Sequence, residues 1–438
     1  MSAAVQTAQA KPRVLVIAEA ANPEMVSVPL VGWSIAQALR SEADVHILTA
    51  MRNREAFLRA GLVEGEDFTA IQNESVARPL WKLSNALRMG TGKGWTTVQA
   101  ISAISYAWFE HLVWREFGAD IRAGKYDIVH RITPLTPTKN SSVAPKCARA
   151  GVPFVMGPLN GGVPWPAGFD AERRREREWL SYIRGVYKIL PGRAATLKAA
   201  RAILVGSRFT QSEVPARYQD RCVYIPENAI DPERFNLRAA PCAHGGPLRI
   251  CFVGRLVPYK GPDMLIEAAL PLLKEGRAVI EMIGDGPMMA DLRAMAAREG
   301  IEDAVRFHGW LEHHKVQEVL AGSDLLGFPS IREFGGGVVL EAMALGVPPL
   351  VADYAGPGEL VQEGWGYKIP FRSRADLVAG VAEALARLVD APEELARSGA
   401  AAHARVEEKF TWARKAEQIA EVYDWVLGRR AERPAPFE

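Results

Sequence analysis

The chain lacks several features that would place it in other protein classes. No apolar run approaches the length needed to cross a bilayer, so no membrane-spanning helix is expected. The four cysteines (Cys147, Cys222, Cys242 and Cys251) show no paired spacing, which argues against a disulfide framework and a cysteine zinc site. There is no Asp-x-Asp pair to hold a metal. No Gly-x-Gly-x-x-Gly follows the first expected strand, which argues against a dinucleotide-dependent oxidoreductase.

The amino-terminal residues also lack an export signal. Residues 1–12 are small and polar, and the apolar run Val14–Ala18 is too short for a signal-peptide core, so we expect a cytoplasmic protein. A chain of 438 residues exceeds what one hydrophobic core usually supports, which predicts two domains. A composition of 48% hydrophobic and 24% charged residues is typical of a globular enzyme.

The net charge of +2 is small, but its distribution is uneven. Residues 1–240 carry 31 Lys and Arg against 22 Asp and Glu, whereas the remainder has a balance of −7. Arg173–Trp179 and the stretch from Trp81 to Trp95 combine cations with aromatic rings. Such segments suit an anionic membrane surface, and ordinary solvated helix faces are the alternative. No nucleic-acid partner is expected.

Short apolar runs bounded by turn residues alternate with helical stretches along the whole chain. This rhythm predicts an α/β fold with two doubly wound parallel-sheet domains in series, separated by a linker at Pro241–Pro247. The expected strands are Lys11–Ala18, Asp44–Thr49, Tyr126–His130, Pro153–Gly157 and Ala202–Ser207, then Leu248–Gly254, Ala278–Gly284, Val305–His308, Leu325–Phe328 and Pro349–Ala352.

The segment from Pro329 to Ala344 carries the most chemical information. It places two carboxylates, Glu333 and Glu341, on either side of the triple glycine Gly335–Gly337, where a strand gives way to a helix over Val338–Leu345. Free N–H groups and the positive dipole end of a helix suit a phosphate. The carboxylates could then hold two hydroxyl-bearing parts of one anionic ligand, as in a sugar nucleotide. A glycine-rich turn with a capping acid and a solvated acid is the alternative.

Other strand ends of the carboxyl-terminal half carry polar groups as well. Gly254–Arg255 ends a strand, and Lys260 precedes the next helix. In an open parallel sheet both cations would point into the crevice, where arginine can grip phosphate oxygens and lysine acts as a point charge. Gly284–Asp285–Gly286 allows a tight turn, and Trp310 could stack on a planar base. A solvated cation, a plain turn and a core tryptophan are the alternatives.

Taken in order, these motifs resemble the donor domain of family-four retaining glycosyltransferases, which have the GT-B fold of two domains facing across a cleft. The resemblance spans about Arg249 to Leu388. It implies that Arg255 and Lys260 bind the donor diphosphate, that Glu333 contacts the sugar hydroxyls and that Glu341 holds the ribose. The remaining donor contacts implied are Gly254, Gly284, Asp285, Gly286, Trp310, Phe334, Gly335, Gly336, Gly337 and Val338.

The amino-terminal half departs from the resembled pattern. Its first loop, Glu19–Pro23, lacks the double glycine of many relatives, and Asn22 with the turn Gly161–Gly162 is expected to line the cleft on the acceptor side. His130 ends an expected strand and resembles the histidine that relatives place beside the transferred sugar. A half-buried, hydrogen-bonded histidine is the alternative.

These observations together predict a retaining hexosyltransferase. It would use a nucleotide sugar, for which the resemblance implies uridine as the default base, and a lipid or membrane-linked acceptor at the inner face of the membrane. Residues 1–240 would bind the acceptor, residues 247–410 the donor, and a final helix near 411–428 would pack back on the amino-terminal domain. The expected catalytic residues are Glu333, Arg255, Lys260 and His130.

No metal or other cofactor is expected, because Arg255 and Lys260 could neutralise the diphosphate. Three alternatives stay open from the sequence. The first is a transferase that builds exopolysaccharide or a soluble glycoside without touching a membrane. The others are a sugar-nucleotide epimerase of similar fold and a non-catalytic sugar-nucleotide sensor.

Overall fold

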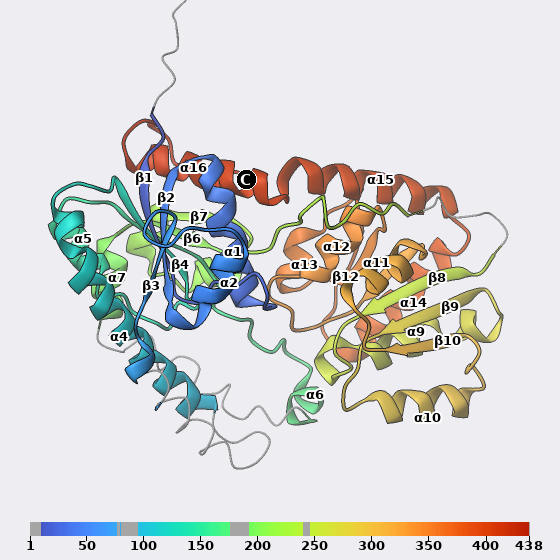
Figure 1. Ribbon diagram of the computed structural model, residues 1–438. Helices are drawn as coiled ribbons and strands as arrows, with labels where there is room; N and C mark the ends of the chain where they lie inside the picture. Colours follow the sequence, from blue (N-terminus) through green and yellow to red (C-terminus); the bar gives the residue numbers. More distant parts are fainter. Residues whose placement is uncertain (1–9, 77–78, 80–94, 176–191, 240–245, 438) are drawn as a thin grey trace, which may run out of the picture.

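The computed structural model describes residues 10–76, 79, 95–175, 192–239 and 246–437. It contains two parallel β-sheets, each flanked by helices (Figure 1). The α/β class and the two doubly wound sheets expected from the sequence are therefore confirmed. Most of the expected linker, and most of the two cationic and aromatic segments, lie outside the described residues.

The amino-terminal sheet has seven strands in the order β3-β2-β1-β4-β5-β6-β7. Its strands are apolar because both faces are covered: along β1, Leu15 and Ile17 enter one core while Val14 and Val16 enter the other. The strands are β1 (Arg13–Ala18), β2 (Asp44–Ala50), β3 (Phe68–Ile71), β4 (Ile128–Thr133), β5 (Phe154–Leu159), β6 (Ala200–Val205) and β7 (Cys222–Tyr224). The helices of this half are α1 (Val28–Ala38), α2 (Arg54–Arg59), α4 (Trp95–Arg122), α5 (Ala144–Arg149), α6 (Asp170–Arg175), α7 (Arg193–Ala199) and α8 (Arg208–Ser212).

The carboxyl-terminal sheet has six strands in the order β10-β9-β8-β11-β12-β13. They are β8 (Leu248–Val253), β9 (Ala278–Ile283), β10 (Val305–Gly309), β11 (Leu325–Phe328), β12 (Pro349–Ala352) and β13 (Tyr367–Ile369). The helices are α9 (Pro262–Lys274), α10 (Met289–Glu299), α11 (His313–Ala321), α12 (Gly337–Leu345), α13 (Ala355–Leu360), α14 (Arg374–Leu388), α15 (Pro392–Lys409) and α16 (Trp412–Val426).

The chain passes between the two halves earlier than the expected linker. Ile225 packs in an amino-terminal core, whereas Ile230 and Phe235 pack in the carboxyl-terminal core. The chain returns at α16, whose Ile419 and Tyr423 lie in an amino-terminal core. Figure 1 shows α15 along the carboxyl-terminal half and α16 continuing onto the amino-terminal half. The two passages meet where the Ile230 N–H bonds to the Phe410 carbonyl at 2.7 Å.

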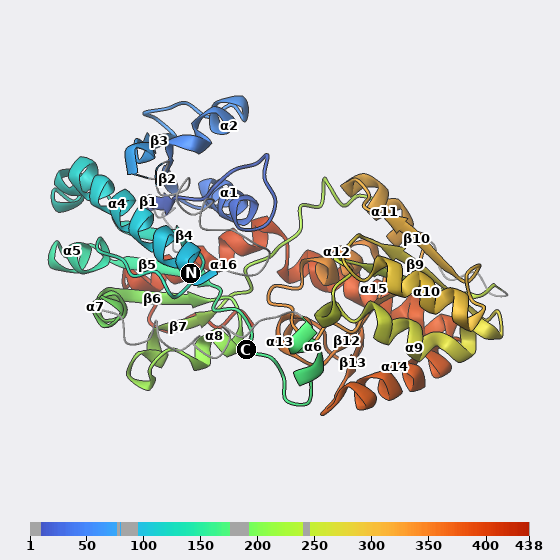
Figure 2. The same cartoon turned by 90° about the horizontal axis from the view of Figure 1, so that it is seen from below.

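A third passage, which the sequence did not indicate, is made by residues 160–175, the segment that follows β5 and ends in α6. Its Phe169 is 1% exposed and belongs to the carboxyl-terminal core, where its ring lies 5.4 Å from that of Phe371. Trp165 lies edge-on to Tyr259 at 6.3 Å, and Glu172 pairs with Arg374 at 3.7 Å. Figure 2 shows α6 beside the carboxyl-terminal half, away from the strand that precedes it.

Each sheet has one place where the strand order reverses. In the amino-terminal sheet it lies between β1 and β4, and in the carboxyl-terminal sheet between β8 and β11. Ligands of open parallel sheets bind outside the carboxyl ends of the strands at such switch points. The loops after these four strands are therefore where chemistry is expected.

Candidate functional site

The switch point of the carboxyl-terminal sheet brings together two of the predicted donor-site loops. Gly254 and Arg255 follow β8, and the loop containing Glu333 follows the neighbouring strand β11. Arg255 is exposed and Glu333 is partly exposed. The strand-end argument from the sequence therefore places these side chains at one edge of the sheet.

Lys260 lies in the same crevice. Its amino group donates a hydrogen bond to Glu333 Oε2, and it sits 5.0 Å from the centre of the Phe328 ring. Burial, together with the charge of Arg255, lowers the pKa of Lys260 to about 8. The lysine is thus held between a carboxylate and an aromatic face, with a second cation nearby.

The glycine-rich loop leads into α12. Gly336 occupies the left-handed region with φ of 56° immediately before the helix, a conformation that glycine adopts without strain. The Asn228 side-chain amide donates to the Gly335 carbonyl at 2.9 Å, so the chain passage between the halves holds this loop. Helix α12 begins at Gly337, so its amino-terminal end follows directly on the loop that carries Glu333.

Glu341 lies one turn into α12, on the side of α11. Its Oε1 is 3.7 Å from Nε2 of His313, the first residue of α11, and the His313 ring is 5.0 Å from that of Phe235. Val338 and Phe334 are partly buried near the same helix start. His313 was missed because an exposed histidine opening a helix has no distinctive sequence pattern.

Two of the predicted donor-site glycines have a packing role. A Cβ atom on Gly284 would lie 1.9 Å from the Gly254 carbonyl oxygen, and one on Gly286 would lie 2.4 Å from the Leu256 carbonyl oxygen. The loops after β8 and β9 therefore pack directly against each other. Asp285 is exposed and its Oδ1 accepts the Gly286 N–H at 2.7 Å. Trp310 is 75% exposed, so it is not a core tryptophan.

His130 occupies a different environment from the one expected. Strand β4 continues to Thr133, so His130 lies within the strand and is fully buried. Its Nε2 donates to the Gly157 carbonyl at 2.9 Å, and its Nδ1 accepts from the Tyr423 hydroxyl at 2.7 Å. Burial, with the nearby charge of Arg131, lowers the pKa of His130 to about 4. Of the two interpretations of His130, the geometry favours the buried, hydrogen-bonded one.

The expected acceptor-side residues lie in the loops after β1 and β5 of the amino-terminal sheet. Asn22 is 7% exposed, and its Oδ1 accepts the Glu24 N–H at 2.9 Å. The Gly161 N–H donates to Thr210 Oγ1 and the Gly162 N–H to Asn160 Oδ1, at 3.0 and 2.9 Å. These groups shape the loops, and their hydrogen bonds are made within the protein.

A buried ionisable pair joins the two halves behind the glycine-rich loop. Glu227 is 7% exposed and accepts from the Asn160 amide at 2.9 Å, while its other oxygen has no hydrogen-bond partner among the described residues. Lys415 of α16 is fully buried and donates to the Pro226 carbonyl. Burial raises the pKa of Glu227 to about 7 and lowers that of Lys415 to about 7. The local sequence signal was an acid shortly after the apolar strand β7.

Within residues 10–76, 79, 95–175, 192–239 and 246–437, no group of three or more His, Cys, Asp or Glu side chains is arranged to hold a metal ion. In the same residues, no helix combines the length and apolar character that a bilayer crossing requires. The three described cysteines are buried and free.

Residues 233–403 match the family model of Glycosyl transferases group 1. The D-inositol 3-phosphate glycosyltransferase of Streptomyces griseus is 34% identical over 193 residues, which cover 42% of this chain and 40% of that protein. The alpha-D-kanosaminyltransferase of Streptomyces kanamyceticus is 28% identical over 244 residues, covering 53% and 62% respectively. This chain thus spans less than two thirds of the length of these curated relatives.

A solved structure matches almost the whole chain. The structure of HepE from Anabaena in complex with UDP aligns with a TM-score of 0.58 at 16% identity, over 94% of this chain and 99% of that one. At this identity the likeness concerns the fold alone. The two parallel-sheet α/β domains thus have the GT-B fold, as the resemblance implied.

Proposed function

We propose that this protein is a glycosyltransferase that moves a hexose from a nucleotide sugar to a lipid or membrane-linked acceptor, with retention of the anomeric configuration. The observation that carries the proposal is the contact between Lys260 and Glu333 beside Arg255, at the carboxyl-terminal switch point. One carboxylate there can bind sugar hydroxyls while two cations bind the adjoining diphosphate.

The chemical task of such an enzyme is to stabilise the departing nucleoside diphosphate. Arg255 is exposed and able to form two parallel hydrogen bonds with phosphate oxygens, and Lys260 adds a second charge. The amides at the start of α12 add the positive end of a helix dipole. These groups are fixed before the reaction begins, so they stabilise developing charge without reorganisation. We propose that they act without a metal ion.

Glu341 and its partner are proposed to hold the nucleoside end of the donor. The carboxylate can accept hydrogen bonds from ribose hydroxyls, and His313 Nε2 lies 3.7 Å from its Oε1. We take a uridine diphosphate sugar as the first donor to test, a choice supported by the UDP bound to HepE. The acceptor would lie across the cleft, against the loops after β1 and β4.

We propose no protein residue as the general base. His130 has both ring nitrogens engaged, and Glu333 accepts a hydrogen bond from Lys260. A front-face displacement, in which the leaving phosphate takes the acceptor proton, is consistent with this arrangement.

The direct test is to incubate the purified protein with a panel of sugar nucleotides and a membrane lipid extract, and to analyse the products by mass spectrometry. We expect a hexose added to a lipid by the native chain and none by Glu333→Gln. Sugar transfer only to soluble glycosides would replace the lipid acceptor with a soluble one. Flotation with anionic liposomes at low salt tests the membrane contact independently, and a chain that stays at the bottom of the gradient would remove it.

A further inference from the structure

A carboxylate that the proposed reaction does not use joins the two halves at α8. Glu359, on α13 of the carboxyl-terminal half, accepts the backbone N–H of Arg208 with both of its oxygens, at 2.9 and 3.1 Å. The Phe209 N–H and the Tyr224 hydroxyl donate to the same carboxylate. Because these three donors belong to the amino-terminal half, Glu359 spans the boundary with a set of charge-assisted hydrogen bonds.

A second contact crosses the boundary beside the first one. Phe334, which follows Glu333 in the glycine-rich loop, lies against Gly206, directly after β6. A Cβ atom on Gly206 would be 3.3 Å from the Phe334 ring. Residues 206–209 are thus held twice from the carboxyl-terminal half, by the Phe334 ring and by the Glu359 carboxylate. We call these two contacts the α8 clamp.

The two parts of the clamp are joined to each other within the carboxyl-terminal half. The Gly356 N–H, in the first turn of α13, donates to the Glu333 carbonyl at 3.2 Å. A Cβ atom on Gly356 would lie 1.8 Å from the Phe334 carbonyl oxygen, so only glycine fits there. The backbone of Glu333 therefore packs on the helix that carries Glu359. A displacement of α13 displaces this loop as well, because close-packed interiors transmit strain.

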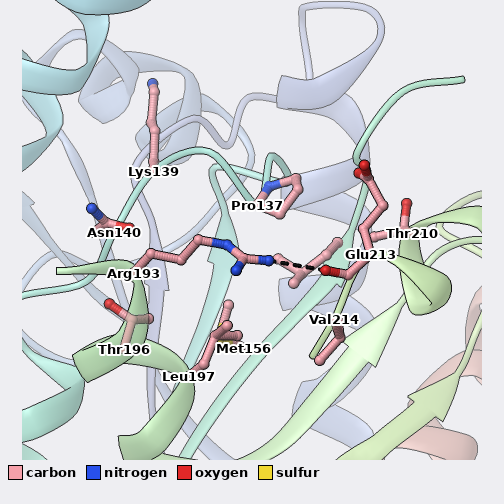
Figure 3. A pocket seen from close by; sticks show the side chains of 11 residues that line it. Pro137, Lys139, Asn140, Met156, Arg193, Thr196, Leu197, Thr210, Glu213 and Val214 are labelled. Carbon is pink, nitrogen blue, oxygen red and sulfur yellow. Dashed lines mark hydrogen bonds between the residues drawn. The ribbon is translucent and has the colours of Figure 1, made fainter. Parts of the chain in front are cut away.

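Helix α8 is firmly attached to the rest of the amino-terminal half. Ser207 Oγ caps it by accepting the Thr210 N–H at 3.0 Å, and Arg193 of α7 donates to the Glu213 carbonyl at its other end, also at 3.0 Å. Figure 3 shows this second bond, with Thr210 close to Glu213. Thr210 Oγ1 also accepts the Gly161 N–H at 3.0 Å. The same helix therefore holds the acceptor-side turn and the donor-side loop.

The carboxyl end of the chain packs on this boundary too. Figure 2 shows it between the two halves, near α8 and α13. The Phe437 ring lies 5.7 Å from that of Tyr224 in the amino-terminal half and 5.3 Å from that of Phe410 in the carboxyl-terminal core. The Phe437 carbonyl accepts from the Arg208 guanidinium at 3.4 Å. Apolar contacts thus accompany the hydrogen bonds at α8.

We infer that Glu359 is a positioning residue, which fixes the loop that carries Glu333 against the amino-terminal half through α8. The inference rests on the proposed function, since it takes Glu333 as the sugar-binding carboxylate. Glu359 acts on the spacing of the halves and not on donor binding, because Arg255, Lys260 and α12 all belong to the carboxyl-terminal half. Sugar transfer requires both halves at one spacing, whereas binding of the diphosphate requires only one of them.

The kinetic test compares sugar transfer with the binding of UDP. Glu359→Gln keeps the shape of the side chain but removes its charge and one accepting oxygen. We expect kcat to fall by about 10- to 100-fold, the scale of a misplacement of about 1 Å, while the Kd for UDP stays close to the native value. Glu363→Gln, which changes an exposed acid of the same half, is the matched control. Equal kcat in the two variants, or a loss of UDP affinity as large as the loss of kcat, would overturn the inference.

Tyr224→Phe keeps the test decisive if Glu359→Gln fails to fold. It removes one donor to the carboxylate and keeps the ring beside Phe437. We expect a loss of kcat with the Kd for UDP unchanged, measured well below the melting temperature. A merely structural contact would instead lower the melting temperature and leave kcat per folded molecule unchanged, and that result would refute the positioning role.

The spacing of the halves can be measured without any reaction. Spin labels are placed at Ser212→Cys and Gln362→Cys, two exposed positions on opposite sides of the boundary. The background is Cys242→Ser, because the other three cysteines are buried. Electron–electron double resonance should show a broader distribution of label distances, shifted to longer values, when Glu359→Gln is added. Identical distributions with and without this change would contradict the inference.

The two levels of the argument fail in different ways. Absence of transfer by the native chain from every donor would remove the proposed function. The label distances would still decide whether Glu359 fixes the spacing of the two halves.

Discussion

The amino group of Lys260 donates a hydrogen bond to the carboxylate of Glu333, which lies 73 residues further along the chain. The pair links the start of α9 to the loop after β11, on either side of the carboxyl-terminal switch point. The two charges satisfy each other in this structure. A bound sugar diphosphate would offer the lysine a phosphate and the carboxylate a set of hydroxyl groups.

Glu333→Gln is expected to abolish sugar transfer without weakening the binding of a nucleoside diphosphate. The amide no longer competes for Lys260, so affinity for UDP should be equal to or greater than that of the native chain. Lys260→Met should have the opposite effect on UDP binding. Calorimetry with UDP and a transfer assay measure the two properties separately. Normal turnover in Glu333→Gln would remove this carboxylate from the site.

Arg255→Ala is expected to weaken UDP binding by about 1.5–3 kcal/mol, the usual scale for hydrogen bonds to a charged group. Arg298→Ala is a suitable control, because Arg298 is an exposed arginine of α10 in the same half. Its UDP affinity should equal that of the native chain. If both variants bind UDP equally well, Arg255 does not contact the diphosphate.

Gly284→Ala should destabilise the fold by about 3 kcal/mol or more, because its Cβ atom would lie 1.9 Å from the Gly254 carbonyl oxygen. Gly276→Ala provides the control: φ is also positive, at +67°, but nothing lies within 4 Å of the added carbon. There the cost should be only about 1 kcal/mol from backbone strain. Urea denaturation of both variants makes the comparison, and equal losses would show that the two loops can move apart.

The contributions of His130 and Tyr423 to the free energy of unfolding are expected to be coupled. Removing either partner, by His130→Phe or Tyr423→Phe, should cost about 1–3 kcal/mol, since it leaves a buried polar group without its hydrogen bond. The double variant should lose clearly less than the sum of the two single losses. Additive losses in chemical denaturation would contradict the direct contact. A loss of turnover at unchanged stability would restore a catalytic role for the histidine.

The stability of the fold should depend on pH through Glu227. Burial raises its pKa from 4.5 to about 7, so the folded chain holds this proton more tightly than the unfolded chain. The stabilisation by protonation therefore appears as pH falls through about 7 and is complete below about 4.5. Glu227→Gln should be more stable than the native chain near pH 8.5, by up to about 3 kcal/mol, and similar to it near pH 5.

The control for this pH profile is Glu24→Gln, since Glu24 is an exposed carboxylate paired with Arg59 at 2.7 Å. Melting temperatures of the three proteins across pH 5 to 9 provide the measurement. A constant difference between Glu227→Gln and the native chain would show that Glu227 does not titrate in this range.

The strand-end argument placed Arg255 and Glu333 at one edge of the carboxyl-terminal sheet because its local signals are strong. Gly254 directly follows β8 and the triple glycine leads into α12, so the charged residues beside them were expected at the sheet edge. The same argument failed for His130, because the strand continues through Arg131 to Thr133 and buries the ring. An apolar run alone does not show where a strand ends when polar residues within it are satisfied by distant partners such as Tyr423.

Contacts between segments far apart in the sequence were beyond prediction. Nothing in the residues around Phe169 distinguishes a side chain that fills the other half's core from one that fills its own. Glu227 and Lys415 were overlooked for a similar reason, since their burial depends on how α16 returns to the amino-terminal half. Local patterns determine elements, whereas these pairings depend on tertiary packing.

The position of Phe169 matters for the design of truncated forms of this protein. The segment matched to the family, residues 233–403, does not contain the ring that completes its own hydrophobic interior. A truncation that begins at residue 233 would leave a cavity beside Phe371 and would remove Glu172, an ion-pair partner of Arg374. The two halves are therefore better regarded as an interlocked product of one chain than as modules that can be exchanged separately.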